Sequence, residues 1–484
     1  MMVLFFYKIF FVNPHIIYRI PVSRGTFMDA LLRFVSTFQE YLWSFPMLVL
    51  LGGTHLYFTV KLRFIQRKIP LGIRLSLGID KTETRQKSQD QLYTHSQLQK
   101  QKDMISPYEA LATALAATIG TGNIVGISTA IALGGPGAVL WCWLTGVFGI
   151  ATCYAECFLA VKYRTKDEAG NFIGGPMYVL ERGLGKRGLA VAFALFAVLA
   201  SFGIGSSVQS HSISTAIRGL VPVSPHVIGI AAGVLAGLVI VGGRQKIAGV
   251  CTWLVPVMSL LYLGGCLWIL GKNRVVLPET FAVIFKDAFS PQAFVGGVAG
   301  RTIMTCMRTG ISRGLFTNEA GLGSIPMAAA SAKTDSAVRQ GLISMTGPFW
   351  DTVVMCAITG VAAVSSMVAD PARYIGIHAD DICMVAFGEL PFGGATVLSV
   401  SLVLFAFATI IGWNVYGTSA VRYLWGEKAV KAYQVVYMLF VYLGAVLSLD
   451  LVWGLSDLFN SFMAIPNLLC LWMLRKTIEL PDRN

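Results

Sequence analysis

The stretch Ala117-Thr-Ile-Gly-Thr-Gly-Asn123 decides the fold of this chain. It lies inside an apolar segment, 107 to 132, that is long enough to cross about 30 Å of hydrocarbon. Inside a bilayer every backbone amide and carbonyl must be paired, so unwound chain persists only where it lines a cavity or is buried in protein. The two glycines permit unwinding, and Thr121 and Asn123 bring short polar side chains to it. The stretch therefore predicts a broken membrane helix.

A broken helix offers oxygen ligands and amide donors at mid-membrane. Freed carbonyls suit Na⁺ or an ammonium group, and the N-terminus of a half-helix presents amides to a carboxylate, so the break fits a zwitterion. Two other interpretations of the glycines are open. They can let neighbouring helices pack closely. Gly120, Gly122 and Gly126 also resemble a dinucleotide-binding GxGxxG, but the spacing is one residue too long and the context is a membrane helix.

The composition excludes an ordinary soluble protein. Of 484 residues, 55% are hydrophobic and 13% are charged, and the mean hydropathy is +0.66, whereas soluble chains average about 25% charged residues. The net charge of +13 does not indicate a nucleic-acid partner, because Lys and Arg lie in the connections between apolar segments and not on one face.

Apolar windows long enough to span a membrane recur along the chain, and we count eleven. They lie near 43–60, 107–132, 137–161, 189–217, 226–242, 248–270, 292–312, 337–366, 391–418, 432–449 and 455–474.

The basic residues predict the orientation, because Lys and Arg accumulate on the cytoplasmic side. Alternate connections hold 28 of them, whereas the opposite loops and the N-terminal segment hold nine. The rich connections are 61–105, 162–187, 243–247, 307–340, 422–431 and 475–484. Eleven spans with a cytoplasmic C-terminus satisfy the rule throughout.

The layout predicts an all-α membrane protein with one leading helix and ten more, the number that two inverted five-helix repeats require. Each half opens on a glycine-interrupted segment, the second being Gly-Gly-Val-Ala-Gly at 296–300. The expected parts are an N-terminal extension and amphipathic lead-in (1–40), an extra transmembrane helix (41–62), a cytoplasmic linker (63–106), two repeats (107–271 and 291–475) and a cytoplasmic tail (476–484). Met28 is an alternative natural start.

Several motifs resemble those of the sodium:alanine (alanine or glycine:cation) symporter family, from about residue 40 to 475. They are Gly120-Thr-Gly-Asn-Ile-Val-Gly126, Gly134-Gly-Pro-Gly-Ala138, Glu156 with Lys162-Tyr-Arg164, Gly174-Gly-Pro-Met-Tyr178, Arg313-Gly-Leu-Phe-Thr-Asn-Glu-Ala-Gly-Leu-Gly-Ser324, Asp351-Thr352, Gly412-Trp413 and Tyr416-Gly417. Thr317 stands where serine is usual, and the linker from 78 to 105 is longer than expected.

The resemblance implies a LeuT-type 5+5 inverted-repeat fold with substrate and sodium at the first and sixth core helices. The implied sodium ligands are the carbonyls of Ala116, Ile119 and Ala406 and the hydroxyl of Thr409. The alternative interpretation of Thr409 is a helix threonine whose hydroxyl bonds to a carbonyl of its own helix.

The expected substrate site combines both breaks with two later helices. Gln209 is an uncharged amide at mid-span, where burying a polar group is costly unless it is paired. The alternative interpretation is that its side chain only forms a hydrogen bond between two helices. Trp413 lies one turn after Thr409 and so shares its face, with an interfacial anchor as its alternative. The expected substrate contacts are Thr121, Gly122, Asn123, Gln209, Gly297, Gly300, Thr409 and Trp413.

Ionisable residues within spans are usually functional. We expect Asp351 to form a structural pair with Arg301 or Arg308, although it could in principle relay protons. Glu156 and Glu319 lie nearer cytoplasmic helix ends, where gating or helix-tethering ion pairs are expected. The inner-gate candidates are Arg313, Asn318 and Glu319.

The leading hypothesis is sodium-coupled symport of alanine or glycine, in the L or D form, by alternating access, with proton coupling as the alternative. The sequence contains no symmetrically repeated filter loop, which a channel would need. It also contains no catalytic constellation, which an enzyme would need. We expect no cofactor beyond the coupling Na⁺, membrane lipid as a partner, a functional monomer and no nucleic acid. The resemblance implies a bacterial inner membrane.

Overall fold

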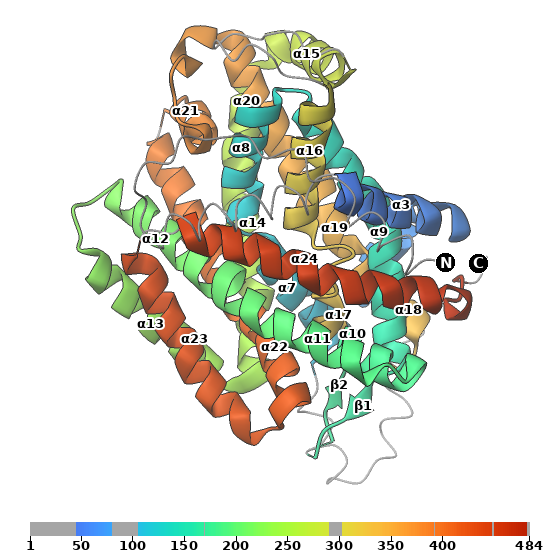
Figure 1. Cartoon of the computed structure of the whole chain (residues 1–484). Coiled ribbons are helices and arrows are strands. Elements are labelled where there is room, and N and C mark those ends of the chain that lie inside the picture. Colours follow the sequence, from blue (N-terminus) through green and yellow to red (C-terminus); the bar gives the residue numbers. More distant parts are fainter. Residues whose placement is uncertain are drawn as a thin grey trace, which may run out of the picture.

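The structure is a computed structural model that describes residues 45–79, 105–168, 170–289, 303–391, 393–447 and 450–481. Within these ranges the chain is predominantly helical, with one small antiparallel hairpin, β1 (Thr165–Lys166) and β2 (Phe172–Ile173). In Figure 1 this hairpin lies at one end of the upright helices, and the short helices α15 (Leu277–Phe289) and α21 (Ile382–Phe387) lie at the other.

The expected leading helix is present as α3 (Phe45–Lys61). The chain then turns by 66° into η1 (Ile65–Lys68) and α4 (Ile69–Ser76). Arg63 and Phe64 take left-handed φ values of 53° and 59° at this turn. α3 packs against α9 (Ala138–Lys162), so the leading helix is attached to the core bundle.

The first broken helix is present where the sequence predicts it. Ser106 caps α7 (Pro107–Thr118) in a reciprocal box with Glu109, which satisfies two orphan amides at the helix start. The chain unwinds after Thr118, passes through the single turn η2 (Thr121–Asn123) and continues as α8 (Val125–Gly134), with a bend of 59° between the two halves.

The rest of the first half follows the predicted order. After α9 come α10 (Pro176–Tyr178), η3 (Val179–Gly183), α11 (Arg187–Ala200), η4 (Ser201–Ser207), α12 (Val208–Arg218), α13 (Pro225–Ile240), α14 (Gly243–Lys272), η5 (Arg274–Val276) and α15. The η4 segment is a π-helical turn inside one long helix, a local widening that is frequent at functional sites.

In the second half, the described helix α16 (Ile303–Asn318) extends six residues beyond the end of the predicted span 292–312. The first part of that span lies outside the described residues. Arg313, which we assigned to the connection 307–340, lies inside this helix, as does Arg308, where the predicted span and connection overlapped. The other elements are α17 (Ile325–Ala329), α18 (Ala337–Ser344), α19 (Thr346–Pro348), η6 (Phe349–Cys356), α20 (Ala357–Ala369), η7 (Pro371–Tyr374), η8 (Ala379–Asp381), α21, α22 (Gly394–Trp425), α23 (Lys428–Val446), α24 (Asp450–Met473) and η9 (Arg475–Thr477).

Six described helices are long and apolar enough to cross a membrane, or eight if each bent pair is one span. This is a multi-pass membrane protein. The count of eleven spans, the inverted repeat and the linker remain predictions, the linker lying mostly outside the described residues. α9 is the most enclosed span, with 83% of its apolar window buried, and it packs against α3, α16 and α18. It therefore runs through the centre of the core.

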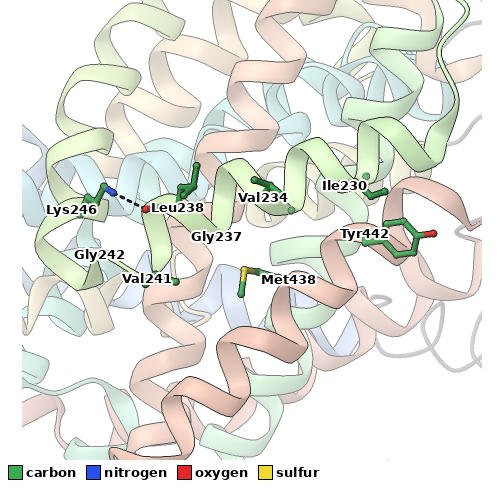
Figure 2. A pocket seen from close by; sticks show the side chains of 11 residues that line it. Ile230, Val234, Gly237, Leu238, Val241, Gly242, Lys246, Met438 and Tyr442 are labelled. Atoms are coloured by element: carbon green, nitrogen blue, oxygen red, sulfur yellow. Dashed lines mark hydrogen bonds between the residues drawn. The ribbon is translucent and has the colours of Figure 1, made fainter.

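A hollow lies on the apolar surface between α13 and α23, as Figure 2 shows. It has a volume of about 740 Å³. Gly237 is needed for close packing there, because a Cβ at this position would stand 2.6 Å from the sulfur of Met438. At one end Lys246 Nζ donates to the carbonyl of Leu238 at 2.7 Å. The exposed aliphatic side chains of α13 identify this groove as part of the lipid-facing surface.

Candidate functional site

A small cavity of about 10 Å³ lies at the first break, in the interior of the bundle. Four helical regions far apart in sequence contribute to it: α7 with η2, the widened η4–α12 helix, the end of α16, and α22. The lining residues are Ala117, Thr118, Gly120, Gly122, Ile204, Gln209, Phe316, Thr317, Glu319, Thr409 and Trp413.

The glycines of the first break allow close approach. A Cβ on Gly120 would stand 2.7 Å from the hydroxyl oxygen of Thr409, and one on Gly122 would stand 2.7 Å from a methyl carbon of Thr317. Neither glycine has a positive φ. Close packing and unwinding therefore occur together here, and the two interpretations of this glycine pair are not exclusive.

Unwinding frees a backbone carbonyl next to Thr409. The amide of Gly120 donates to Asn123 Oδ1 at 2.9 Å and so does not complete the usual helical bond to Ala116. Instead the Thr409 hydroxyl lies 3.2 Å from the Ala116 carbonyl and 3.0 Å from that of Phe405. Ala116 and Thr409, from the expected sodium set, are thus brought together, and Ile119 and Ala406 are buried as well.

These neutral oxygens suit a monovalent cation. The described residues contain no group of three or more His, Cys, Asp or Glu that could hold a metal ion. Carbonyl and hydroxyl oxygens are hard ligands, and a set without a carboxylate leaves the bound charge to be balanced by other groups.

Two of the expected substrate residues, Thr121 and Gln209, contact each other from different helices, and of these two Gln209 lines the cavity. Thr121 Oγ1 donates to Gln209 Oε1 at 3.3 Å, and Gln209 Nε2 donates to the Ile204 carbonyl at 3.0 Å. Gln209 thus orients the break against η4. Trp413 lies on the same cavity as Thr409, as their spacing of one turn predicted, and it is fully buried, which rules out an interfacial anchor.

Asn123 does not line the cavity in this structure. Its amide nitrogen donates to Asp351 Oδ1 at 2.7 Å and to the Asp351 carbonyl at 3.1 Å. Asn123 therefore ties the first break to η6 as a positioning residue.

Asp351 makes no ion pair with a described arginine, so the expected pairing with Arg308 was wrong, and Arg301 lies outside the described residues. The other oxygen of this carboxylate accepts from Thr352 Oγ1 at 2.6 Å. In the described structure, neutral donors from Asn123 and Thr352 contact the two oxygens of this carboxylate.

A second break lies opposite the first, at Glu319–Ser324 between α16 and α17. Gly321 and Gly323 have φ values of 90° and 85°, and Glu319, a non-glycine residue, has φ 53°. We expected this break at 296–300. Those residues, including Gly297 and Gly300, lie outside the described part of the chain, so their role remains a prediction.

The expected inner-gate cluster is not a connected group. Glu319 accepts from Trp413 Nε1 at 3.0 Å and from the Ser324 hydroxyl, whereas Asn318 donates to Thr145 at 3.4 Å. Arg313 instead exerts a Coulombic attraction on Asp457 of α24. Six residues separate Arg313 from Glu319 along α16, and this separation directs the two side chains to different neighbours.

Glu156 also lacks the expected ion pair. Asn467 Nδ2 donates to its carboxylate and, at 2.9 Å, to the Gly321 carbonyl. Glu156 is buried and supports the second break through Asn467.

Several cavity residues were missed from the sequence: Ala117, Thr118, Ile204, Phe316 and Thr317. The signal for the last two was present, since both lie inside the motif from Arg313 to Ser324. We had treated that motif as a gate because the break was expected about twenty residues earlier.

A family model matches nearly the whole chain. The model of the sodium:alanine symporter family matches residues 28–480. The chain belongs to the sodium:alanine symporter family. It is a family of transporters and not of enzymes.

Curated relatives of this symporter family align over nearly the full chain. An uncharacterized transporter of Haemophilus influenzae is 44% identical over 92% of this chain and 94% of its own length. The sodium/alanine symporter AgcS of Methanococcus maripaludis is 41% identical over 91% and 94%. A probable sodium/glutamine symporter, GlnT of Bacillus subtilis, is 34% identical over 91% and 87%.

The fold is also similar to that of a solved transporter. A Na⁺-coupled sialic acid symporter, in a substrate-bound outward-open state, superimposes with a TM-score of 0.53 at 13% identity, covering 91% of this chain and 100% of that one. At this identity the likeness concerns the fold alone.

Proposed function

We propose that this protein is a secondary symporter that imports a small neutral amino acid, alanine or glycine, together with Na⁺ by alternating access. The observation that carries the proposal is the enclosed cavity between two helix breaks, lined by both apolar and polar groups. Membership of the sodium:alanine symporter family supports the coupling ion and the substrate class.

The proposed sodium site lies where α7 ends against α22. Its ligands are the Thr409 hydroxyl and the carbonyls of Ala116, Ile119 and Ala406. The 3.2 Å contact between Thr409 and Ala116 supports it, because an oxygen pair at this distance needs little movement to hold one ion. A modest number of neutral ligands favours a weakly held ion that can be released on the other side.

The proposed substrate site occupies the cavity itself. The proposed substrate contacts are polar groups and one aromatic side chain, from Thr121, Gly122, Gln209, Thr409 and Trp413. Asn123 holds the conformation of the break from outside the cavity lining. Glycines 297 and 300 remain proposed contacts.

The size of the cavity favours a small side chain. In this structure the cavity measures about 10 Å³ and is lined by the large side chains of Phe316, Ile204 and Trp413, so a small substrate requires the least widening. A relative named as a probable sodium/glutamine symporter makes glutamine the larger competitor to test.

Uptake into proteoliposomes tests the proposal. With an inward Na⁺ gradient, labelled alanine or glycine should accumulate above its external concentration, and replacing Na⁺ with choline should abolish accumulation. Equal uptake in choline would rule out sodium coupling. An imposed proton gradient in the same vesicles then tests the alternative coupling ion.

We also propose that the protein acts as a monomer in the inner membrane of a bacterium, with a cytoplasmic C-terminus. The excess of basic residues in alternate connections supports this orientation.

A further inference from the structure

Glu319 occupies a strained position at the edge of the substrate cavity. Its φ of 53° is left-handed, and among the described residues only Arg63 and Phe64 share this feature without being glycine. A non-glycine residue in this region costs about 1–3 kcal/mol and persists where the surrounding structure requires it, often at ligand sites. Here the turn takes the chain out of α16 and brings the carboxylate to the cavity.

Both oxygens of this carboxylate are held by neutral donors. Trp413 Nε1 donates to Oε1 at 3.0 Å, and the Ser324 hydroxyl donates to Oε2. No Lys, Arg or His in the described structure forms an ion pair with Glu319. Each carboxylate oxygen can accept more than one hydrogen bond, so the group retains capacity for a ligand.

The surroundings favour a cation at this place. The cavity lining contains no basic side chain, Glu319 is only 2% exposed, and the nearby acids Asp351 and Glu156 act on it by Coulombic repulsion. A buried negative charge without a cationic partner is costly. A positively charged group that enters the cavity would remove that cost.

We propose that the Glu319 carboxylate binds the ammonium group of the substrate. This assignment rests on the proposed transport of amino acids and goes beyond the gating role expected from the sequence. With the zwitterion bound, the substrate carboxylate is left for Na⁺ and the amides at the first break. Glu319 thereby selects amino acids over acids of the same size that lack the amine.

The test pairs each amino acid with its hydroxy-acid analogue: alanine with lactate, glycine with glycolate, and glutamine with its 2-hydroxy analogue. Binding to the purified full chain is measured in saturating Na⁺ by competition with the labelled amino acid. Truncating one member of a buried charge pair costs about 2–5 kcal/mol, which is roughly 30-fold or more in affinity. Wild-type protein should therefore prefer the amino acid by at least about 30-fold. Glu319→Gln should reduce this ratio to about threefold or less.

Two further variants separate this role from a structural one. Glu389→Gln removes an acid whose side chain is 3% exposed and pairs with Lys272 away from the cavity lining, and it should leave the ratio of amino acid to hydroxy acid as in the wild type. Glu319→Asp keeps the charge and should retain part of the preference. It also serves as the readout if Glu319→Gln does not give a monodisperse, folded protein.

An unchanged ratio in Glu319→Gln, or an equal loss in Glu389→Gln, would overturn the assignment. If Glu319→Gln changed only the Na⁺ concentration needed for binding, Glu319 would be a sodium ligand instead. If it changed only the pH dependence of binding, Glu319 would be a proton site. If the wild-type protein binds glutamine but not alanine, the small-substrate proposal is refuted. The role of Glu319 is then tested with glutamine and its 2-hydroxy analogue. Binding of no amino acid refutes both.

Discussion

At the scale of single residues, short polar side chains hold the first break in place. Asn123 accepts from the Gly120 amide and donates to Asp351, and Thr121 contacts Gln209 on α12. These bonds satisfy groups that would otherwise be unpaired in the interior of a membrane protein.

Asn123→Leu should reduce sodium-dependent alanine uptake by at least about tenfold. The substitution leaves Asp351 Oδ1 without its donor from Asn123 and frees the Gly120 amide, and each unsatisfied buried group costs about 1–3 kcal/mol. Uptake per folded transporter in proteoliposomes is the measurement. Leu133→Ala, an exposed position on the same half-helix, is the control. Normal uptake by Asn123→Leu would refute the role of Asn123 while leaving the fold intact.

Thr409→Ala should raise the Na⁺ concentration for half-maximal uptake by about tenfold, because a hydrogen-bonding or coordinating group lost from a charged ligand costs about 1.5–3 kcal/mol. Ser401→Ala is a matched control: it is buried on the same helix, and its hydroxyl also donates to a carbonyl one turn earlier. Equal shifts in the two variants would argue against a sodium site at Thr409.

At the scale of elements, the second break depends on glycines that accept unusual backbone angles. Gly321 has φ 90°, and a Cβ there would stand 2.6 Å from a methyl carbon of Leu51 on α3. The leading helix thus packs directly on the broken part of the second half.

Gly321→Ala should lower the thermal stability of the purified protein, since backbone strain of about 1–3 kcal/mol adds to a clash with Leu51. Gly426→Ala carries a similar φ of 80° but has open space around the new methyl group, so it isolates the strain. A melting temperature for Gly321→Ala equal to that of Gly426→Ala would show that packing against α3 contributes nothing.

Arg164 connects the loop after α9 to the chain that follows α17. Its guanidinium donates to the carbonyls of Ala332 at 2.7 Å and Ala330 at 3.3 Å, and also to that of Thr334. It stacks 3.4 Å from the ring centre of Phe172. Burial lowers the pKa of Arg164 to about 10, so the side chain is still a cation at neutral pH. These bonds satisfy carbonyls at a helix C-terminus, where a cation is favoured.

Arg164→Ala should make the buried C-terminal end of α17, which we predict to be cytoplasmic, more accessible, because three carbonyls each lose a hydrogen bond from the guanidinium. The readout is the maleimide labelling rate of Ser331→Cys in inside-out vesicles, which we expect to rise several-fold. The nine native cysteines are buried and give a low background. Arg187→Ala, an exposed arginine in a long 3.8 Å ion pair, should not change the rate. An unchanged labelling rate in Arg164→Ala would contradict the prediction that this arginine keeps the end of α17 inaccessible.

At the scale of the whole molecule, the order of helices determines which loops share a side of the membrane. If the predicted spans are right, five of them separate the loop at Leu220 from that at Lys428, so the two lie on opposite sides. An impermeant maleimide applied to intact cells should label Leu220→Cys but reach Lys428→Cys only after permeabilisation. Labelling of both from outside would contradict the span count.

The sequence by itself determined the helical class, the position of most helices and the first break. Hydropathy and glycine placement are local properties, and each membrane helix satisfies its own backbone hydrogen bonds. The predicted windows therefore agree with α7–α8, α9, α13 and α18–α20 to within a few residues.

Only the tertiary structure decided where the second break lies and what the buried acids contact. Glu319 meets Trp413, Asp351 meets Asn123 and Glu156 meets Asn467 across 94, 228 and 311 residues of sequence. We expected cations beside these acids because unpaired charge is costly in a membrane. In the described structure a neutral donor from a distant helix contacts each of them, although one Glu156 oxygen has no partner, and no local pattern encodes which distant donor arrives.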